Sequence, residues 1–372
     1  MPRKIQPDRW LFIVTVALCF VGVVMVFSAS AVTARENFGG AYVFFGKQFA
    51  FLLVGGVGMW WLMNFDYRKL REPGIVFTVL SVVLVLLIGV FFLDKSHATH
   101  RWIRFGPVGI QPSELAKLAV ILYLAWFLDM RCAPRRFEEA PGVNDLMRAL
   151  LPALAPPLVM AALVVMQPDL GTAFELFVIS LAMLFVAGLS LRYVSYAALA
   201  AVPLIYLLIM RVPYRYNRIV AFMNPEADPQ GTSFQLLQSL IAVGSGGLTG
   251  VGLMESRQKL FYLPEAHTDF IFAVLCEELG FIGGAIVLIL FAIYGWRGLR
   301  TAMGAPDSFG RFAALGITAM VMSQALINLS VVLGLMPTKG IPLPFISYGG
   351  SSLVVMLLAT GVLLNISQHA EE

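Results

Sequence analysis

Long apolar runs separated by short polar stretches dominate the chain. Each run is long enough to cross the hydrocarbon core of a bilayer, which takes about 17 to 25 residues as a helix. The runs lie at 10–32, 48–65, 74–93, 112–129, 149–167, 170–190, 193–211, 270–294, 311–333 and 346–366. This pattern predicts an all-α, polytopic integral membrane protein with about ten transmembrane helices.

The nearly continuous apolar stretch over 149–211 is expected to form three helices. Pro168 and Gly171 interrupt it first, because proline removes a helical hydrogen-bond donor and glycine favours a turn. A short polar turn at 189–192 interrupts it again. The long segment at 212–268 is then expected to lie outside the membrane as a large extracytoplasmic loop before the eighth helix.

The composition excludes a soluble globular protein. The chain of 372 residues is 59% hydrophobic and 13% charged, whereas soluble domains carry about 25% charged residues. No stretch is polar enough to form a separate domain, so residues 1–372 are expected to form a single transmembrane domain. The net charge of +4 is spread in small groups, which gives no case for nucleic-acid binding. Cys19, Cys132 and Cys276 form no disulfide or zinc framework.

Positive charge lies on both sides of the predicted membrane. The apolar run from Trp10 to Val26 is longer than the core of a signal peptide, so a retained first helix is expected. With the N-terminus inside, every inner loop is basic, which predicts cytoplasmic N- and C-termini. The outer loops also carry Arg101, Arg104, Arg215, Arg218, Arg257, Lys259 and Lys339. Because orientation does not require this outer charge, it indicates a site on the outer face.

The fourth apolar segment and its flanks hold ionisable groups. Glu114 and Lys117 lie three residues apart and share a helix face, so they are expected to pair, either as a structural ion pair or with a direct role in binding. Arg101 either binds a phosphate group or extends to lipid head groups. Asp169, directly after Pro168, either caps the next helix or faces a polar cavity.

The outer segment mixes aromatic and cationic residues. Tyr214, Arg215 and Arg218 offer the combination that sugar stacking and phosphate pairing need, although an interfacial aromatic belt explains the tyrosine equally well. Residues 234–243 are expected to form a short helix with Gln235 on its polar side. The glycine-rich stretch that follows is no dinucleotide fingerprint, because no strand precedes it and no acidic residue follows at the required distance.

Two outer stretches adjoin the last helices. Glu265, His267 and Asp269 alternate before the eighth helix, where Asp269 could serve as a cap, but the crowding indicates a further role. Two acids and one histidine are a weak metal signature, so no metal ligand is assigned. The outer stretch at 335–352, a loop that runs into the tenth helix, carries Lys339 and Ser351. No G-x-S-x-G elbow or base accompanies Ser351, which excludes serine hydrolysis.

These stretches together resemble the SEDS (shape, elongation, division and sporulation) family of cell-wall polymerases over essentially the whole chain. The residues that carry the resemblance lie at 101–104, 111–117, 167–172, 262–272 and 337–352. Within the family, 264–269 and 336–340 are more similar to the division protein FtsW than to the elongation protein RodA, and a sporulation relative would look similar. The resemblance implies a ten-helix fold and a peptidoglycan glycosyltransferase.

The resemblance also implies the substrate, partners and location. The substrate would be lipid II, an undecaprenyl-pyrophosphate-linked disaccharide pentapeptide, polymerised at the outer face of the cytoplasmic membrane during septal cell-wall synthesis. The implied partners are membrane lipids, a class B penicillin-binding protein transpeptidase and other divisome proteins. No cofactor is certain, and a divalent cation, Mg²⁺ or Mn²⁺, could assist the leaving group.

The family's essential aspartate maps onto Asp269. In an inverting transfer Asp269 would be the general base, with cations stabilising the pyrophosphate. A carboxylate near its reference pKa of about 4 is ionised at neutral pH, so no special deprotonation is expected. The residues assigned to substrate binding are Arg101, Arg215, Arg218, Lys339, Ser351, Gln235 and His267.

Three other functions fit parts of the sequence. They are an elongation-type polymerase, a lipid II flippase or secondary transporter, and a non-catalytic scaffold for a division enzyme. Transporters usually place polar sites near the bilayer midplane. Here the polar motifs cluster at the outer boundary, with Glu114, Lys117 and Glu175 as the main exceptions.

Overall fold

Ten long helices match the ten apolar segments. A computed structural model describes residues 6–94, 100–105, 108–132, 143–260 and 262–370. In these ranges the long helices are α1 (Arg9–Phe38), α2 (Val43–Asn64), α3 (Pro73–Leu93), α4 (Pro112–Cys132), α5 (Leu151–Met166), α6 (Leu170–Val186), α7 (Leu191–Met210), α10 (Ile271–Gly304), α11 (Ser308–Val332) and α12 (Gly350–Ser367). By length and composition, seven helical stretches among the described residues could cross a membrane. The prediction of an all-α polytopic membrane protein is confirmed.

Shorter elements connect these helices. They are η1 (Tyr67–Arg71), β1 (Ile103–Phe105), β2 (Val108–Ile110), η2 (Leu146–Leu150), α8 (Pro213–Met223), η3 (Pro225–Ala227) and α9 (Phe234–Ser245). The sequence predicted α9, whereas the antiparallel β1–β2 hairpin and α8 were not expected. Pro213 at the first turn of α8 is a usual helix-start residue, because its missing N–H has no helical partner to lose.

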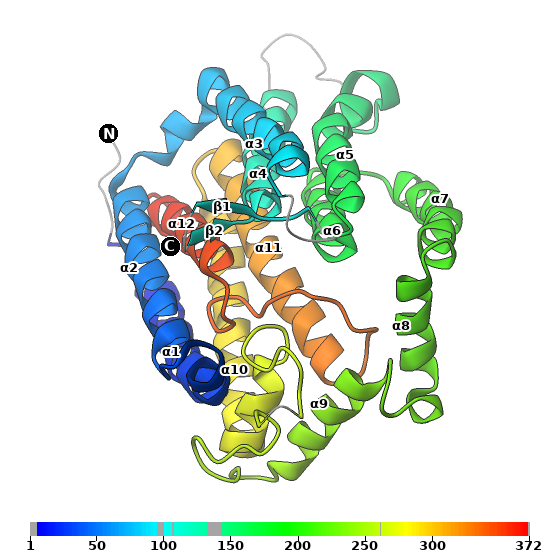
Figure 1. Cartoon of the computed structure of the whole chain (residues 1–372). Helices are drawn as coiled ribbons and strands as arrows, with labels where there is room; N and C mark the ends of the chain where they lie inside the picture. The colour runs from blue at the N-terminus through cyan, green and yellow to red at the C-terminus, as the bar shows by residue number, and fades with distance from the viewer. Residues whose placement is uncertain (1–5, 95–99, 106–107, 133–142, 261, 371–372) are drawn as a thin grey trace.

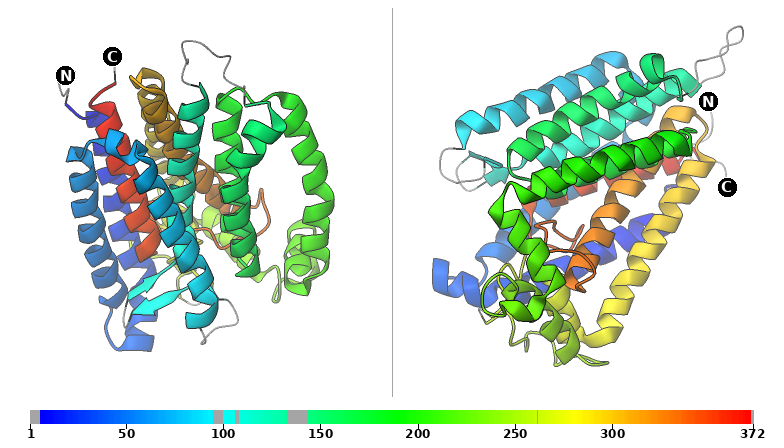
Figure 2. Two further views of the ribbon diagram at one scale, coloured as in Figure 1. Left: turned by 90° about the horizontal axis from the view of Figure 1, so that it is seen from above. Right: turned by 90° about the vertical axis from the view of Figure 1, so that its right-hand side faces the viewer.

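The helices form one bundle around a buried core (Figure 1). In it α12 packs against α2, α11 against α4 and α10, and α1 against α10. α7 and α8 stand at the edge of the bundle (Figure 1). The described ends of the chain lie together at one end, which we name the terminal end, and the hairpin lies at the other, as the left view of Figure 2 shows. The loops that the sequence predicts to be extracytoplasmic gather at this second end, which we name the loop end.

A glycine-rich loop inserts into a break in α10. Gly280 interrupts the helix with φ 67° and ψ −166°, a conformation that favours glycine. Backbone groups freed at the break pair with the loop at 2.9 to 3.2 Å. These bonds run from Phe281 N to Gly247 O, from Ile282 N to Leu248 O, from Val251 N to Glu277 O and from Gly252 N to Glu278 O. The glycines therefore let two backbones meet.

Gly246→Ala is expected to destabilise the protein, whereas Gly244→Ala is expected to be tolerated. A Cβ at Gly246 would lie 1.9 Å from the carbonyl oxygen of Cys276, whereas one at Gly244 would have no atom within 4 Å. Overpacking against rigid backbone costs about 1–3 kcal/mol. Thermal unfolding of both purified variants in detergent checks this prediction. Equal unfolding midpoints in the two variants would contradict the close packing of the glycine-rich loop against α10.

Candidate active site

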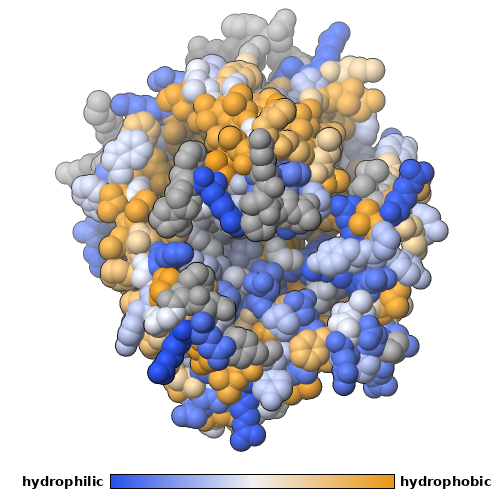
Figure 3. All heavy atoms as spheres, viewed as in Figure 1, coloured by the Kyte–Doolittle hydropathy of each residue, from blue (hydrophilic) through white to orange (hydrophobic). Residues whose placement is uncertain are grey.

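Asp269 lies at the loop end, two residues before α10 begins. The N-cap of α10 is Phe270, with no side-chain capping bond, so Asp269 does not act as the helix cap. Protein surrounds its side chain on most sides but leaves it partly exposed. Figure 3 shows that this face of the molecule is hollowed at its centre, where hydrophilic side chains gather.

Hydrogen bonds fix the backbone around Asp269. Asn328 on α11 donates from Nδ2 to the carbonyl oxygens of Asp269, at 2.7 Å, and of Ile341, at 2.8 Å. Ser347 Oγ donates to the Thr268 carbonyl at 2.6 Å. These bonds tie the segment before α10 to the loop before α12. Sequence reasoning missed Asn328 and Ser347, and the signal for Asn328 was a polar residue within an apolar helix.

The loop before α12 also approaches the Asp269 carboxylate directly. A Cβ at Gly340 would lie 3.2 Å from Asp269 Oδ2, so glycine keeps space open beside the carboxylate. Lys339 lies next to Gly340, and its Nζ sits 4.4 Å from the centroid of the Phe174 ring, a cation–π contact. Burial lowers the pKa of Lys339. This loop therefore leaves space open beside the aspartate and places the Lys339 cation against the Phe174 ring of α6.

The charges of two arginines from other parts of the chain act on Asp269. The positive charges of Arg218 and Arg101 both lower its pKa, which places them near the carboxylate. Arg218 donates to the Thr338 carbonyl at 2.9 Å and stacks on Tyr214. Arg101 donates to the Gln167 carbonyl at 3.1 Å. Both guanidinium groups are thus anchored by neutral acceptors, which leaves their charge available to an anion.

Two other cations that the sequence predicts on the outer side, Arg215 and Lys259, differ in position. Burial and the nearby charge of Arg101 lower the pKa of Arg215, so Arg215 lies on the same side as Arg101. Lys259 is buried, and its Nζ pairs with Glu278 at 2.8 Å. The outer positive charge is thus only in part available to a ligand, because Lys259 belongs to the packing between its loop and α10.

The expectation that Asp269 is ionised like an ordinary aspartate is wrong. Burial, followed by the negative charges of Glu265 and Asp169, raises its pKa to about 7, although Arg218 and Arg101 oppose the rise. A carboxyl group that loses its proton near neutral pH is better matched to general-base chemistry than one with a pKa of about 4. At neutral pH the Asp269 carboxyl group is therefore protonated in part of the molecules and ionised in the rest.

This pKa predicts a pH-dependent effect of Asp269→Asn on stability. Because the folded pKa of about 7 lies above the unfolded value, ionisation destabilises the folded state as pH rises toward 7. Asp269→Asn, which stays neutral, is therefore expected to raise the unfolding midpoint more at about pH 8 than at about pH 5. Thermal scans at the two pH values check this, with Glu255→Gln, an exposed carboxylate of the same outer segment, as the unchanged control.

Asp169 caps α6, the first of its two predicted roles. Its carboxylate caps α6, accepting from the Thr172 N–H at 3.1 Å and from the Thr172 hydroxyl at 2.8 Å. Gln111 donates to the same carboxylate at 3.2 Å. Its charge also raises the pKa of Asp269, so the cap residue lies close enough to act on the site.

The predicted pair of Glu114 and Lys117 is confirmed and belongs to a larger buried cluster. Lys117 Nζ lies 3.0 Å from Glu114 and 3.2 Å from Glu175 on α6. It also donates to Gln324 on α11 at 2.6 Å. Gln324 in turn donates to the Pro342 carbonyl at 2.8 Å. The cluster therefore joins three helices beneath the loop that adjoins Asp269.

Three other candidates for substrate binding are His267, Ser351 and Gln235. In the described part of the chain, none of their side chains contacts the Asp269 side chain. His267 packs against Phe44 and Tyr348, with ring centroids 4.9 and 5.6 Å away, and burial lowers its pKa. The Ser351 hydroxyl is buried with no hydrogen-bond partner in the described part of the chain. Gln235 is half-buried on α9. In the described ranges, no three His, Cys, Asp or Glu residues group as metal ligands would.

Known proteins resemble this chain over nearly its whole length. The family model described as "cell cycle protein", for FtsW, RodA and SpoVE, matches residues 9–372. Stage V sporulation protein E of Bacillus subtilis is 44% identical, with 99% of each chain covered. A probable peptidoglycan glycosyltransferase FtsW of Trichlorobacter lovleyi is 43% identical, covering 98% of this chain and 94% of that protein.

Solved structures share the fold. A chain in a structure described as a peptidoglycan synthase complex that coordinates polymerization and crosslinking has a TM-score of 0.77 and 30% identity, with 97% of each chain covered. The rod shape determining protein RodA of Thermus thermophilus has a TM-score of 0.70 and 28% identity, with 98% of each covered. The aspartate site at the loop end therefore lies on a shared fold, and the chain belongs to the FtsW, RodA and SpoVE family of cell cycle proteins, the SEDS family.

Proposed function

We propose that the protein is a peptidoglycan glycosyltransferase that polymerises lipid II into glycan strands. The observation that carries this proposal is Asp269, a carboxyl group with a pKa of about 7 and with Arg101 and Arg218 near it. Lipid II offers a sugar joined to pyrophosphate, a good leaving group whose charge needs stabilisation. One base and several cations supply what that transfer requires.

Each part of the site has a separate role in this reaction. Asp269 accepts the proton of the acceptor sugar's 4-hydroxyl as that oxygen attacks the anomeric carbon of the donor. Arg101, Arg218 and Lys339, with Arg215 beside them, bind the pyrophosphate that departs with the electron pair of the broken bond. Converting an α-linked donor into a β-1,4 product is an inversion, so a single displacement suffices. Gln235, His267 and Ser351 remain candidates for substrate binding.

We further propose that the loop end faces outward from the cytoplasmic membrane and that both termini are cytoplasmic. Lipid II must meet the polymerase on the side where glycan strands are made, and the inner loops are basic. A septal role rests on the likeness to FtsW, whereas the likeness to stage V sporulation protein E favours a sporulation role. Fluorescent fusions followed through division and spore formation separate these roles.

A class B penicillin-binding protein is the proposed partner. One solved relative comes from a structure described as a peptidoglycan synthase complex that coordinates polymerization and crosslinking. Co-purification with the transpeptidase, together with a faster polymerase rate when it is added, would support this pairing. An unchanged rate would argue against activation.

Purified protein supplied with lipid II tests the proposal. The expected product is glycan polymer, and EDTA decides whether a divalent cation is needed. Lipid transport is the second candidate, because the buried cluster around Lys117 places charge inside the helix bundle. Translocation of lipid II in vesicles without polymer, unaffected by Asp269→Asn, would favour transport.

A further inference from the structure

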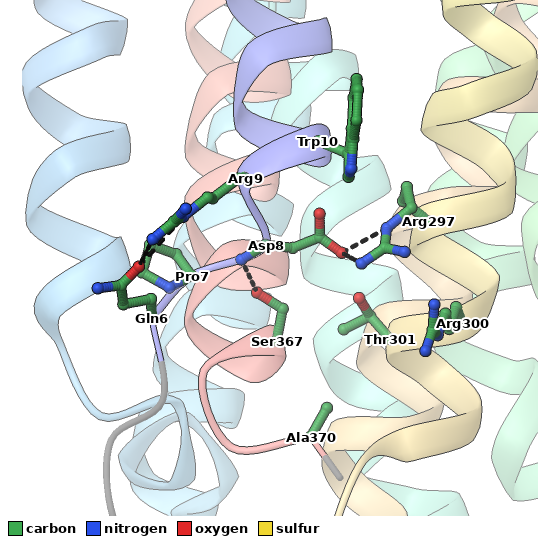
Figure 4. Close-up of a pocket in the computed structure, with 10 residues that line it drawn as sticks. All are labelled: Gln6, Pro7, Asp8, Arg9, Trp10, Arg297, Arg300, Thr301, Ser367 and Ala370. Carbon is green, nitrogen blue, oxygen red and sulfur yellow. Dashed lines mark hydrogen bonds and ion pairs between the residues drawn. The ribbon is translucent and has the colours of Figure 1, made fainter. Parts of the chain in front are cut away.

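A pocket of about 520 Å³ opens at the terminal end of the bundle. It lies between the start of α1, the last turns of α10 and the end of α12, as Figure 4 shows. Along α10 it is on the order of 40 Å from Asp269, at 1.5 Å per helical residue. It is therefore separate from the proposed active site.

Positive charge exceeds negative charge in this pocket. Three arginines, Arg9, Arg297 and Arg300, line it with a single carboxylate, Asp8. The Asp8 carboxylate is already paired with one of these arginines. It accepts hydrogen bonds from the Leu11 N–H at 3.0 Å and from Arg297 Nε at 2.6 Å. Two guanidinium charges thus remain for a ligand.

The two remaining arginines have no acidic partner among the described residues. Arg9 donates from Nε to the neutral Gln6 side chain at 3.1 Å. In Figure 4, Arg300 lies on α10 beside Thr301, and no dashed line joins it to another residue that is drawn. Both side chains are exposed, so an anion can reach them without displacing an ion pair.

Aromatic and apolar side chains place the pocket at the membrane surface. Trp10 on α1 and Trp296 on α10 are 60% and 61% exposed, and exposed tryptophans gather where lipid head groups meet the hydrocarbon. Further from the pocket along each helix, toward the middle of the bundle, Ile13 on α1 and Ile289 on α10 are also exposed. The pocket therefore opens next to a surface that acyl chains can cover.

We propose that this pocket binds the phosphodiester head group of an anionic phospholipid. Arg300 binds the phosphate beside Thr301, Arg9 on the other side of Asp8 adds its positive charge to the pocket, and the acyl chains lie along the exposed apolar surfaces of α1 and α10. A free phosphate ester shares the head-group chemistry, but the exposed tryptophans and apolar residues favour the lipid. Basic pockets between transmembrane helices on this side of a membrane are known to bind such head groups. The lipid would brace α1, α10 and α12 far from the reaction.

Native mass spectrometry of the full purified chain tests the proposal. Phosphatidylglycerol or phosphatidylcholine is titrated into the wild type, the Arg9→Gln/Arg300→Gln variant and the Arg9→Lys/Arg300→Lys variant. The matched control is Arg148→Gln/Arg311→Gln, two exposed arginines outside the pocket. We expect the wild type to prefer phosphatidylglycerol and the glutamine variant to bind it roughly 10- to 30-fold more weakly. The lysine variant and the control should bind it within a few-fold of the wild type.

Three results would overturn the proposal. The first is a glutamine variant that keeps the wild-type preference. The second is an equal loss in the Arg148→Gln/Arg311→Gln control, which would indicate general surface charge. The third is displacement of the bound lipid by millimolar inorganic phosphate, which would indicate a site for free phosphate. None of these results depends on polymerase activity, so the proposal can fail while the glycosyltransferase stands.

Discussion

Replacing Asp269 by asparagine is expected to lower the rate of lipid II polymerisation by about 10²–10⁴, the usual contribution of a general base. Asparagine has nearly the same shape but cannot accept a proton. The backbone contacts that hold the site are made by the carbonyl of residue 269 to Asn328, and the substitution leaves them in place. The loss should therefore appear in the rate constant of the reaction, and substrate binding should change much less.

The matched control for this experiment is Glu255→Gln. Glu255 is an exposed carboxylate on the same outer segment, so its loss changes the net charge by the same amount without touching the site. We expect its activity to stay within about two-fold of the wild type. Substitutions of exposed residues away from such sites usually change the free energy of unfolding by only about 0.5 kcal/mol, so the variant should remain folded. Equal losses in both variants would mean that outer negative charge, and not a base at Asp269, supports activity.

Lys117→Met is expected to cause the largest loss of stability, about 3–5 kcal/mol, because breaking a buried ion pair leaves its partner charges uncompensated. Lys117 is fully buried and lies within 3.2 Å of both Glu114 and Glu175. Methionine fills a similar volume but offers no charge or donor. Thermal unfolding in detergent measures the loss.

A triple variant separates charge from packing at this cluster. Combining Lys117→Met with Glu114→Gln and Glu175→Gln removes the cation and both anions together. We expect the triple variant to be more stable than Lys117→Met alone, because no carboxylate is then left without a cation. A triple variant less stable than the single one would show that packing, and not charge, makes Lys117 important.

Apolar patterning predicted the helices well because a membrane span needs a long apolar run, a signal that survives without tertiary information. The pairing of Glu114 with Lys117 was also predictable, since three residues along a helix bring side chains to one face. Glu175 and Gln324 complete that cluster from other helices. Their participation depends on how the helices pack, which the sequence does not display.

The sequence predicted which aspartate forms the site but did not predict the pKa of that aspartate. The resemblance to known polymerases located Asp269, but its pKa of about 7 depends on burial and on Glu265 and Asp169. The glycine-rich stretch was understood only as lacking a nucleotide fingerprint. Its insertion into α10 at Gly280 is a contact between distant segments, and no local pattern encodes it.

The most direct test of Asp269 as a general base with a raised pKa is the pH dependence of kcat/KM for lipid II. It is measured for the purified wild type and Asp269→Asn from about pH 5.5 to about pH 8.5. This ratio reports the pKa values of the free enzyme. The wild type should lose about tenfold in rate for each pH unit below about 7, the pKa that burial gives Asp269. Asp269→Asn should be slow at every pH and lack this slope. A flat wild-type profile, or an asparagine variant that polymerises lipid II at the wild-type rate, would contradict the account.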